Sequence, residues 1–345
     1  MNAAEALQSI GWRGGLPAGR LARVVAQHRA SYELSDGTRW FTAQAANHFL
    51  KRGIDPAERP AVGDFVQLAA TRDEIASILP RRSALTRAAA GERYQRQIIA
   101  TNIDSVLVLT GLDGDFNPRR IERYLTLVEG SGARAVVVLT KADKVPDAAQ
   151  QLDELMARLP PATPLMAINA KDPANVAALE PWLQPGDTVV LVGSSGAGKS
   201  TLTNSLLGET RMATGSVRES DSRGRHTTTH RALLPLPGGA CLIDTPGMRE
   251  LKLTGEESLE LFADLDALVT RCRFADCGHG REPGCAVRQA IDNGELAAER
   301  WANYSKLMAE RAQQAATLKA RQQHGRARAG HGRGGAGRPR ARDEE

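Results

Sequence analysis

Residues Gly193 to Ser200, Gly-Ser-Ser-Gly-Ala-Gly-Lys-Ser, have the types and spacing of a phosphate-binding loop. In such loops glycines let consecutive backbone N–H groups surround the β-phosphate, and the following helix adds the positive end of its dipole. We expect Lys199 to reach the β- and γ-phosphates and the Ser200 hydroxyl to bind Mg²⁺. The predicted phosphate contacts are Gly193, Ser194, Ser195, Gly196, Ala197, Gly198, Lys199, Ser200 and Thr201.

The segments that flank this loop are those that the motif requires. Residues 187–192 are β-branched and apolar, as in a buried parallel strand, and residues 200–207 predict a helix. A chance glycine- and serine-rich turn would not need that strand and helix. Strands and helices also alternate from residue 104 to 182, which predicts a mainly parallel sheet with helices on both faces.

Two further segments could read guanine. The run Thr140–Asp143, Thr-Lys-Ala-Asp, ends a predicted strand. The Asp143 carboxylate would accept hydrogen bonds from the guanine ring N–H and amino group, while the stem of Lys141 covers the base. Adenine offers no such pair of donors, although a solvated loop would also fit so short a run. Asn169 and Ala170 end the next strand and resemble an element that supports guanine O6 through a backbone N–H, with Asn169 in place of the usual serine.

A third strand end could sense the γ-phosphate. Asp244-Thr-Pro-Gly247 follows an apolar strand, so Asp244 would hold a Mg²⁺-bound water and the Gly247 N–H would contact the γ-phosphate. The long polar segment 208–229 that precedes it is typical of a switch loop, with Thr228 as a further Mg²⁺ ligand.

Met248 stands where many GTPases carry a glutamine that orients the attacking water. A thioether cannot do this usefully, so another group must place the water. Our candidate is His226, because an imidazole can hydrogen-bond a water, and with Lys199 and Thr228 it forms the predicted catalytic set. The alternative is that His226 only contacts RNA.

The order of these segments is unusual. The guanine-reading run at 140–143 precedes the phosphate-binding loop, and nothing after Gly247 resembles a second one. Ordinary GTPases have the opposite order, so the sequence predicts a circularly permuted GTPase. The permutation ties the second switch directly to the C-terminal region, through which movement on hydrolysis could pass.

The C-terminal region combines a metal motif with a basic tail. Three thiols and one imidazole within a short turn-rich segment suit tetrahedral Zn²⁺ without an open position, a structural site. The predicted zinc ligands are Cys272, Cys277, His279 and Cys285. A helix over 296–318 should follow, and then an Arg/Gly-rich tail that we expect to be disordered. The tail would contact RNA phosphates or only add solubility.

The N-terminal region predicts a small β-barrel of the OB type. Short strand-like runs with turns between them extend from residue 21 to 68. Tyr32, Trp40 and Phe41 could stack on nucleic-acid bases, but for each of them individually we favour the barrel core.

The composition excludes membrane-spanning and disulfide-rich classes. The chain has 345 residues, 41% hydrophobic and 25% charged, with net charge +5. The start of the chain shows no signal-peptide hydrophobic region, so we expect a cytoplasmic protein without membrane contact, and a monomer. The predicted division is 1–18 flexible, 19–82 OB-fold, 83–100 basic connector, 101–254 permuted GTPase, 255–318 helical zinc-binding domain and 319–345 disordered tail.

Together these features resemble the ribosome small-subunit-dependent GTPase family RsgA (YjeQ), over about residues 15 to 310. The resemblance rests on the barrel, permuted GTPase and zinc module in that order and on four runs: Phe116 to Leu125, Gly224 to Thr229, Asp244 to Gly247 and Cys277 to Val287. It implies a factor in late maturation of the small (30S) subunit that binds GTP, GDP and rRNA and whose GTP hydrolysis the subunit stimulates. It also points to His226 as the catalytic group.

Two other functions remain open from the sequence. The chain could be a nucleotide-gated RNA-binding chaperone whose hydrolysis is incidental, which turnover with and without 30S subunits would distinguish. It could also be a P-loop ATPase or kinase, against which Asp143 argues.

Overall fold

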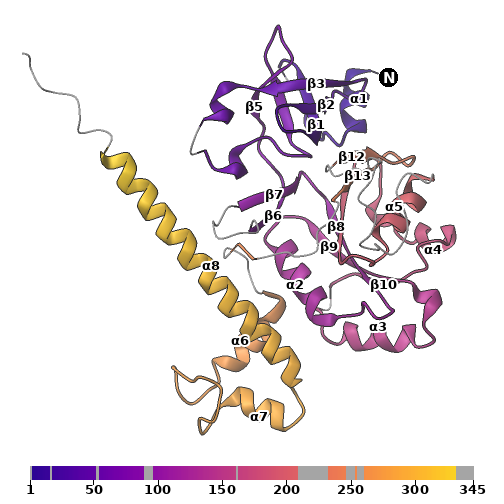
Figure 1. Cartoon of the computed structure of the whole chain (residues 1–345). Helices are drawn as coiled ribbons and strands as arrows, with labels where there is room; N and C mark the ends of the chain where they lie inside the picture. The colour runs from indigo at the N-terminus through magenta and orange to yellow at the C-terminus, as the bar shows by residue number, and fades with distance from the viewer. Residues whose placement is uncertain are drawn as a thin grey trace, which may run out of the picture.

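The computed structural model describes residues 2–15, 18–51, 54–88, 96–160, 162–208, 232–245, 253–254 and 260–331, with side chains as far as Ala320. Figure 1 shows a β-barrel above a sheet with helices on its faces, and a helical C-terminal part below from which one long helix extends. No helix of the described part is long and apolar enough to cross a membrane.

The N-terminal barrel is closed and OB-like, as predicted. Its order is β1-β2-β3-β5-β4, with β4 pairing back to β1 and β3 running parallel to β5. Val24, Leu34 and Ile75 are fully buried inside it. Its elements are α1 (Ala3–Ser9), β1 (Leu21–Gln27), β2 (Tyr32–Ser35), β3 (Trp40–Ala45), η1 (Asn47–Leu50), η2 (Pro56–Glu58), β4 (Phe65–Leu68) and β5 (Glu74–Ile78).

The segment that we expected to be a basic connector forms a hairpin. Strands β6 (Ala84–Ala88) and β7 (Arg96–Thr101) pair antiparallel as a separate small sheet. The Ala84 N–H donates to Ser131 O, 2.8 Å away, which ties this hairpin to the central domain.

The central sheet is mainly parallel, as predicted. Its order is β10-β9-β8-β11-β13-β12, in which only β12 runs antiparallel, and β12 also meets β1 of the barrel at Ala232 and Ala26. Its strands are β8 (Ser105–Gly111), β9 (Arg134–Thr140), β10 (Leu165–Ala167), β11 (Thr188–Gly193), β12 (Ala232–Pro235) and β13 (Cys241–Asp244).

Helices cover both faces of this sheet because successive strand residues point to opposite sides. Val106 and Val108 of β8 join one buried cluster with Ile121 of α2, whereas Leu107 joins another with Leu202 of α5. The helical elements are α2 (Pro118–Glu129), η3 (Ala142–Lys144), α3 (Ala148–Met156), α4 (Pro173–Ala177), η4 (Glu180–Trp182) and α5 (Lys199–Leu207).

The C-terminal part is helical, with η5 (Glu260–Phe262), α6 (Ala263–Val269), α7 (Ala286–Asp292) and α8 (Ala298–His331). Helix α8 continues past residue 318 as far as His331, whereas we expected a disordered tail from residue 319. Alanine, arginine and glutamine, which dominate this stretch, favour helix even without tertiary contacts. Residues 332–345 of the expected tail lie outside the described residues.

Candidate functional site

The phosphate-binding loop lies at the carboxyl end of β11 and leads into α5. Gly193 has φ +152°, and a Cβ there would lie only 2.3 Å from Leu109 O, so β8 and the loop can approach this closely only with glycine. Gly198 has φ +87° and precedes the first residue of α5, Lys199. The loop therefore has the backbone shape and the helix N-terminus that a phosphate group requires.

The Lys199 side chain reaches back from the start of α5 to this loop. Its Nζ donates to Gly193 O at 2.8 Å and to Ser194 O at 2.5 Å. Burial lowers the pKa of this ammonium, while Asp244 and Asp115 act in the opposite direction. The charge is thus held by loop carbonyls, where it can meet the β- and γ-phosphates.

The predicted guanine-reading run contacts the phosphate-binding loop directly. The Thr140 hydroxyl, at the end of β9, donates to Ala197 O at 2.8 Å. Lys141 has φ +62°, in the left-handed region, and Asp143 is exposed beyond it. The structure therefore brings together two segments whose predicted roles are at opposite ends of one nucleotide.

The second predicted guanine element joins the same site. The Ala142 N–H donates to Ile168 O at 3.2 Å, and the Ser205 hydroxyl of α5 donates to Ala170 O at 2.6 Å. Asn169 accepts a hydrogen bond from Lys171 N at its side-chain oxygen, 3.0 Å away. The asparagine in place of serine thus shapes the turn after β10.

Asp244 ends β13, which lies next to β11 in the sheet, and it is only 8% exposed. Burial raises its pKa, and Lys199 opposes this shift. Ser200 at the start of α5 and Asp244 are oxygen donors of the kind that Mg²⁺ prefers. The other predicted members, His226, Thr228 and Gly247, lie outside the described residues, as does Met248.

Two carboxylates at this edge were missed from the sequence. Asp113 and Asp115 follow β8; Asp113 Oδ2 lies 2.6 Å from Lys141 Nζ, and Asp115 accepts a hydrogen bond from the Ser194 hydroxyl. A usable signal existed, because the run Asp-Gly-Asp directly follows a buried strand whose carboxyl end must lie at this edge.

A second site, remote in sequence, could hold a metal ion. The ligand atoms of Cys272, Cys277, His279 and Cys285 all lie within 4.8 Å of one another. His279 Nδ1 is 3.5 Å from Cys272 Sγ and 3.7 Å from Cys285 Sγ. Tetrahedral zinc, with bonds of about 2.3 Å to sulfur and about 2.0 Å to nitrogen, separates such atoms by about 3.5 Å. The spacing of the four predicted donor atoms therefore fits a tetrahedral zinc ion.

The loop that carries these ligands is braced by its own residues. Glu282 accepts hydrogen bonds from Gly278 N at 3.1 Å and Gly280 N at 2.7 Å, on either side of His279. The His279 ring packs edge-on against Trp301 of α8, with 5.0 Å between ring centroids. The ligand loop is thus fixed to the long helix.

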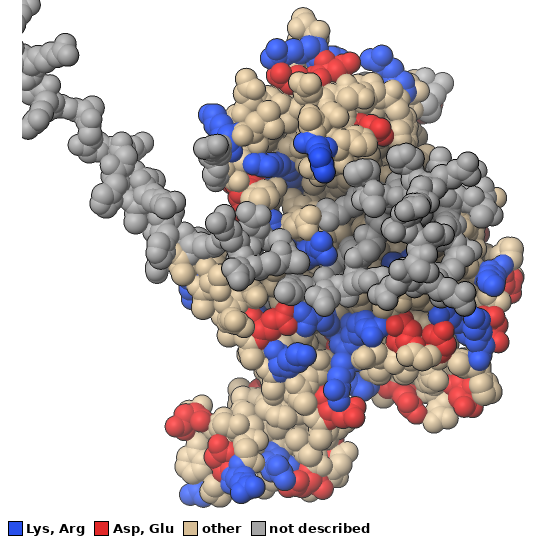
Figure 2. Space-filling model, in the orientation of Figure 1, with Lys and Arg blue, Asp and Glu red and all other residues tan. Residues whose placement is uncertain are grey.

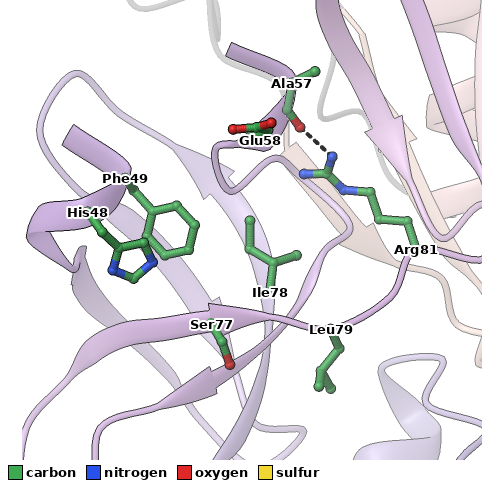
Figure 3. Close-up of a pocket in the computed structure, with 8 residues that line it drawn as sticks. All are labelled: His48, Phe49, Ala57, Glu58, Ser77, Ile78, Leu79 and Arg81. Atoms are coloured by element: carbon green, nitrogen blue, oxygen red, sulfur yellow. Dashed lines mark hydrogen bonds between the residues drawn. The ribbon is translucent and has the colours of Figure 1, made fainter. Parts of the chain in front are cut away.

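A shallow cavity of about 460 Å³ lies on the barrel, far from these motifs. Figure 3 shows Phe49 and Ile78 as apolar wall, with Arg81 at the rim. The Arg81 guanidinium is already engaged by Ala57 O at 2.5 Å and by Asp64 at 2.7 Å. The charge at this rim is neutralised, so the cavity has no strong anion-binding group.

Comparisons with known proteins agree with this geometry. The family model "RsgA GTPase" matches residues 78–254. The small ribosomal subunit biogenesis GTPase RsgA of Xanthomonas euvesicatoria pv. vesicatoria is 56% identical over 335 residues, 91% of each chain. The protein of that name from Xanthomonas oryzae pv. oryzae is 55% identical over the same share of each chain.

Solved structures give the same fold. YjeQ from Thermotoga maritima superposes with TM-score 0.60 at 25% identity, over 85% of this chain and 98% of that one. YloQ, a circularly permuted GTPase, superposes with TM-score 0.56 at 24% identity, over 85% and 95% of the two chains. This likeness, the matching family model and the close relatives place the chain in the RsgA GTPase family.

Proposed function

We propose that this protein is a GTP hydrolase that acts in late maturation of the small ribosomal subunit and leaves the subunit after hydrolysis. The observation that supports this most is the contact of Thr140 with Ala197, which joins the guanine-reading and phosphate-binding segments into one site. The small ribosomal subunit enters the proposal as the partner because the names of the curated relatives refer to it. We also propose that the protein acts as a cytoplasmic monomer. The described segments that would bind the nucleotide all meet within one domain, as in a site formed by a single chain.

The nucleotide would be held at both ends. Asp143 selects guanine, with support for O6 from Asn169 and Ala170, and the loop from Gly193 to Thr201 surrounds the phosphates. Bound together with GTP, Mg²⁺ would supply positive charge that stabilises the phosphates during transfer. Its proposed ligands are Ser200, Thr228 and, through a water, Asp244.

Hydrolysis needs a positioned water. We assign this to His226 of the first switch, while the Gly247 N–H contacts the γ-phosphate. Docking on the subunit would bring the imidazole to the water, so that stimulation is pre-organisation of the site.

The remaining parts would bind the subunit. Tyr32 is buried in the barrel and belongs to its core, whereas Trp40 on β3 is 51% exposed and can stack on a base. The Arg39 guanidinium lies 5.1 Å from the ring centroid of Phe41 beside it. In Figure 2 a group of Lys and Arg side chains lies just below the grey residues, with Asp and Glu side chains beside it; the basic group suits contact with rRNA phosphates.

The Cys272, Cys277, His279 and Cys285 cluster would hold one structural Zn²⁺. When bound, the ion cross-links the loop between α6 and α7, and with four protein ligands it has no position for a reacting water.

The test is GTP turnover with and without purified 30S subunits, with ATP as competitor. We expect stimulation by the subunit and inhibition by GDP but not by ATP. Binding to 30S without stimulated turnover would favour the RNA chaperone, and equal competition by ATP would favour an ATPase.

A further inference from the structure

Two aspartates outside the nucleotide motifs touch those motifs. Asp113 and Asp115 lie in the loop between β8 and α2. Asp113 pairs with Lys141 of the guanine-reading run, and Asp115 accepts the hydroxyl hydrogen of Ser194 in the phosphate-binding loop. One short loop thus contacts both segments that are to bind the nucleotide.

The Asp115 carboxylate is fixed before any nucleotide arrives. Its Oδ1 lies 2.5 Å from Arg120 Nη1, and its Oδ2 accepts Gly111 N at 3.4 Å in addition to the Ser194 hydroxyl. The side chain is only 18% exposed. Because Arg120 belongs to the first turn of α2, the carboxylate is anchored to a rigid element and not to another loop.

Ser194 connects this carboxylate to Lys199. Its hydroxyl donates to Asp115, and its carbonyl oxygen accepts Lys199 Nζ at 2.5 Å. Without the hydrogen bond to Asp115, the Ser194 peptide could rotate and so change the direction of the ammonium. Since the lysine stabilises charge on the γ-phosphate during transfer, such a shift would slow hydrolysis more than it weakens GDP binding.

Asp113 holds a lysine in the same way at the end of the site where the guanine base is expected to bind. Lys141 has φ +62°, a backbone conformation that is uncommon for lysine and persists where neighbours hold it. Its Nζ lies 2.6 Å from Asp113 Oδ2. The hydrogen bond from Lys141 lowers the pKa of Asp113, as expected for a carboxylate that stays ionised beside an ammonium.

We infer that Asp113 and Asp115 are positioning residues of the GTP site: Asp113 sets Lys141 against the guanine base for binding, and Asp115 sets Ser194, and through it Lys199, against the β- and γ-phosphates for hydrolysis. The inference rests on the proposed function. We expect neither carboxylate to contact the nucleotide, because each already pairs with a cation of the protein, Asp113 with Lys141 and Asp115 with Arg120.

The experiment measures kcat and KM on 30S subunits and equilibrium affinity for GDP and GTP. Asp115→Ala and Ser194→Ala should each lower kcat about tenfold, the worth of one hydrogen bond to a charged group, with GDP affinity changed less than about twofold. The double variant should be no slower than either single variant, because both remove the same hydrogen bond. Asp115→Asn should recover part of kcat, since its amide oxygen still accepts from Ser194.

Asp113→Ala should instead weaken GDP and GTP binding alike, by about tenfold, with kcat within about twofold of wild type. The control is Asp153→Ala, which removes an exposed carboxylate from α3. Additive losses in the Asp115/Ser194 pair, or wild-type kinetics for Asp115→Ala or Asp113→Ala, would overturn the inference while wild-type turnover stands. A wild-type protein without GTP turnover would overturn the proposed function, and the inference with it.

Discussion

At the scale of single residues, we expect guanine selection to depend on the Asp143 carboxylate, which is exposed in η3, just after β9. Asp143→Asn should weaken GTP binding and favour xanthosine triphosphate, because the amide offers a donor where the xanthine ring carries an acceptor. Competition assays with the two nucleotides measure the change. Asp147→Asn, a nearby exposed aspartate, is the control and should keep the preference for GTP. An unchanged preference in Asp143→Asn would remove Asp143 from the site.

The water-positioning role that we propose for His226 also concerns a single residue. His226→Ala should leave GTP affinity and 30S binding nearly intact and lower stimulated turnover about a hundredfold, the lower range for general acid–base groups. Single-turnover hydrolysis on 30S subunits measures this, with His48→Ala on the barrel surface as control. Wild-type turnover in His226→Ala would mean that backbone or the ribosome holds the water.

At the scale of elements, the metal loop between α6 and α7 should depend on its ion. Cys277→Ala should lose about one equivalent of zinc and destabilise the C-terminal helices, because the free energy of metal binding stabilises the folded loop. Metal analysis and thermal unfolding measure the two effects. Cys241→Ala is the matched control: this cysteine is buried in β13, away from the cluster, so zinc content should stay at wild-type level. Wild-type protein without zinc would contradict the assignment.

The far half of α8 and the residues after it should add affinity for the 30S subunit and little specificity for a particular rRNA sequence. After Leu307 no residue of α8 is buried as far as Ala320, and its sequence carries no acid from Arg311 onward until Asp343. Deleting 319–345 should weaken 30S binding and flatten its salt dependence, by about 0.9 in log–log slope for each phosphate that the tail neutralises, while basal turnover stays. A variant of the same length with the arginines changed to glutamine separates charge from length. An unchanged slope would leave only the solubilising role.

The sequence predicted those elements whose signal lies in a short run of consecutive residues. The apolar run before Gly193 and the glycines after it define β11 and its loop, because both patterns lie within a few consecutive residues. The contact of Asp115 with Ser194 could not be predicted, because it joins residues far apart in sequence. The β6–β7 hairpin was not predicted either, because its arginines hide the strand pattern and indicate a basic connector.

At the scale of the whole molecule, helix α2 connects the GTPase domain to the C-terminal part through hydrogen bonds and ion pairs with α8. Glu122 of α2 is fully buried and accepts from Asn303 of α8 at 2.5 Å and from Arg158 at 3.0 Å. Arg123, next to it, forms a bidentate pair with Glu310 of α8, at 2.8 and 2.6 Å. Arg120 in the first turn of α2 pairs with Asp115, so this one helix contacts both the loop after β8 and α8, the helix that we propose binds the subunit.

Glu310 also accepts the Leu253 N–H, at 3.2 Å, where the chain enters the C-terminal part. Burial would raise the pKa of this carboxyl, but the hydrogen bonds from Arg123 outweigh it and hold the pKa below its usual range. A carboxyl whose pKa is lowered by folding stabilises the folded state above its unfolded pKa of about 4.3. That contribution is lost as the pH falls through the folded pKa, because protonation removes the charge that Arg123 pairs with.

Glu310→Gln should therefore lower the free energy of unfolding by about 1–2 kcal/mol at pH 7, with a smaller difference from wild type near pH 4 and below. Denaturant unfolding at both pH values measures this. Glu299→Gln is the matched control on the same helix: it removes a pair with Arg119 of α2 at 3.2 Å, but the Glu299 side chain is 73% exposed. Such a surface pair contributes about 0–1 kcal/mol, so its loss should be small at either pH. Equal effects of the two substitutions at pH 7 would show that the Arg123–Glu310 pair does not hold α8 on α2.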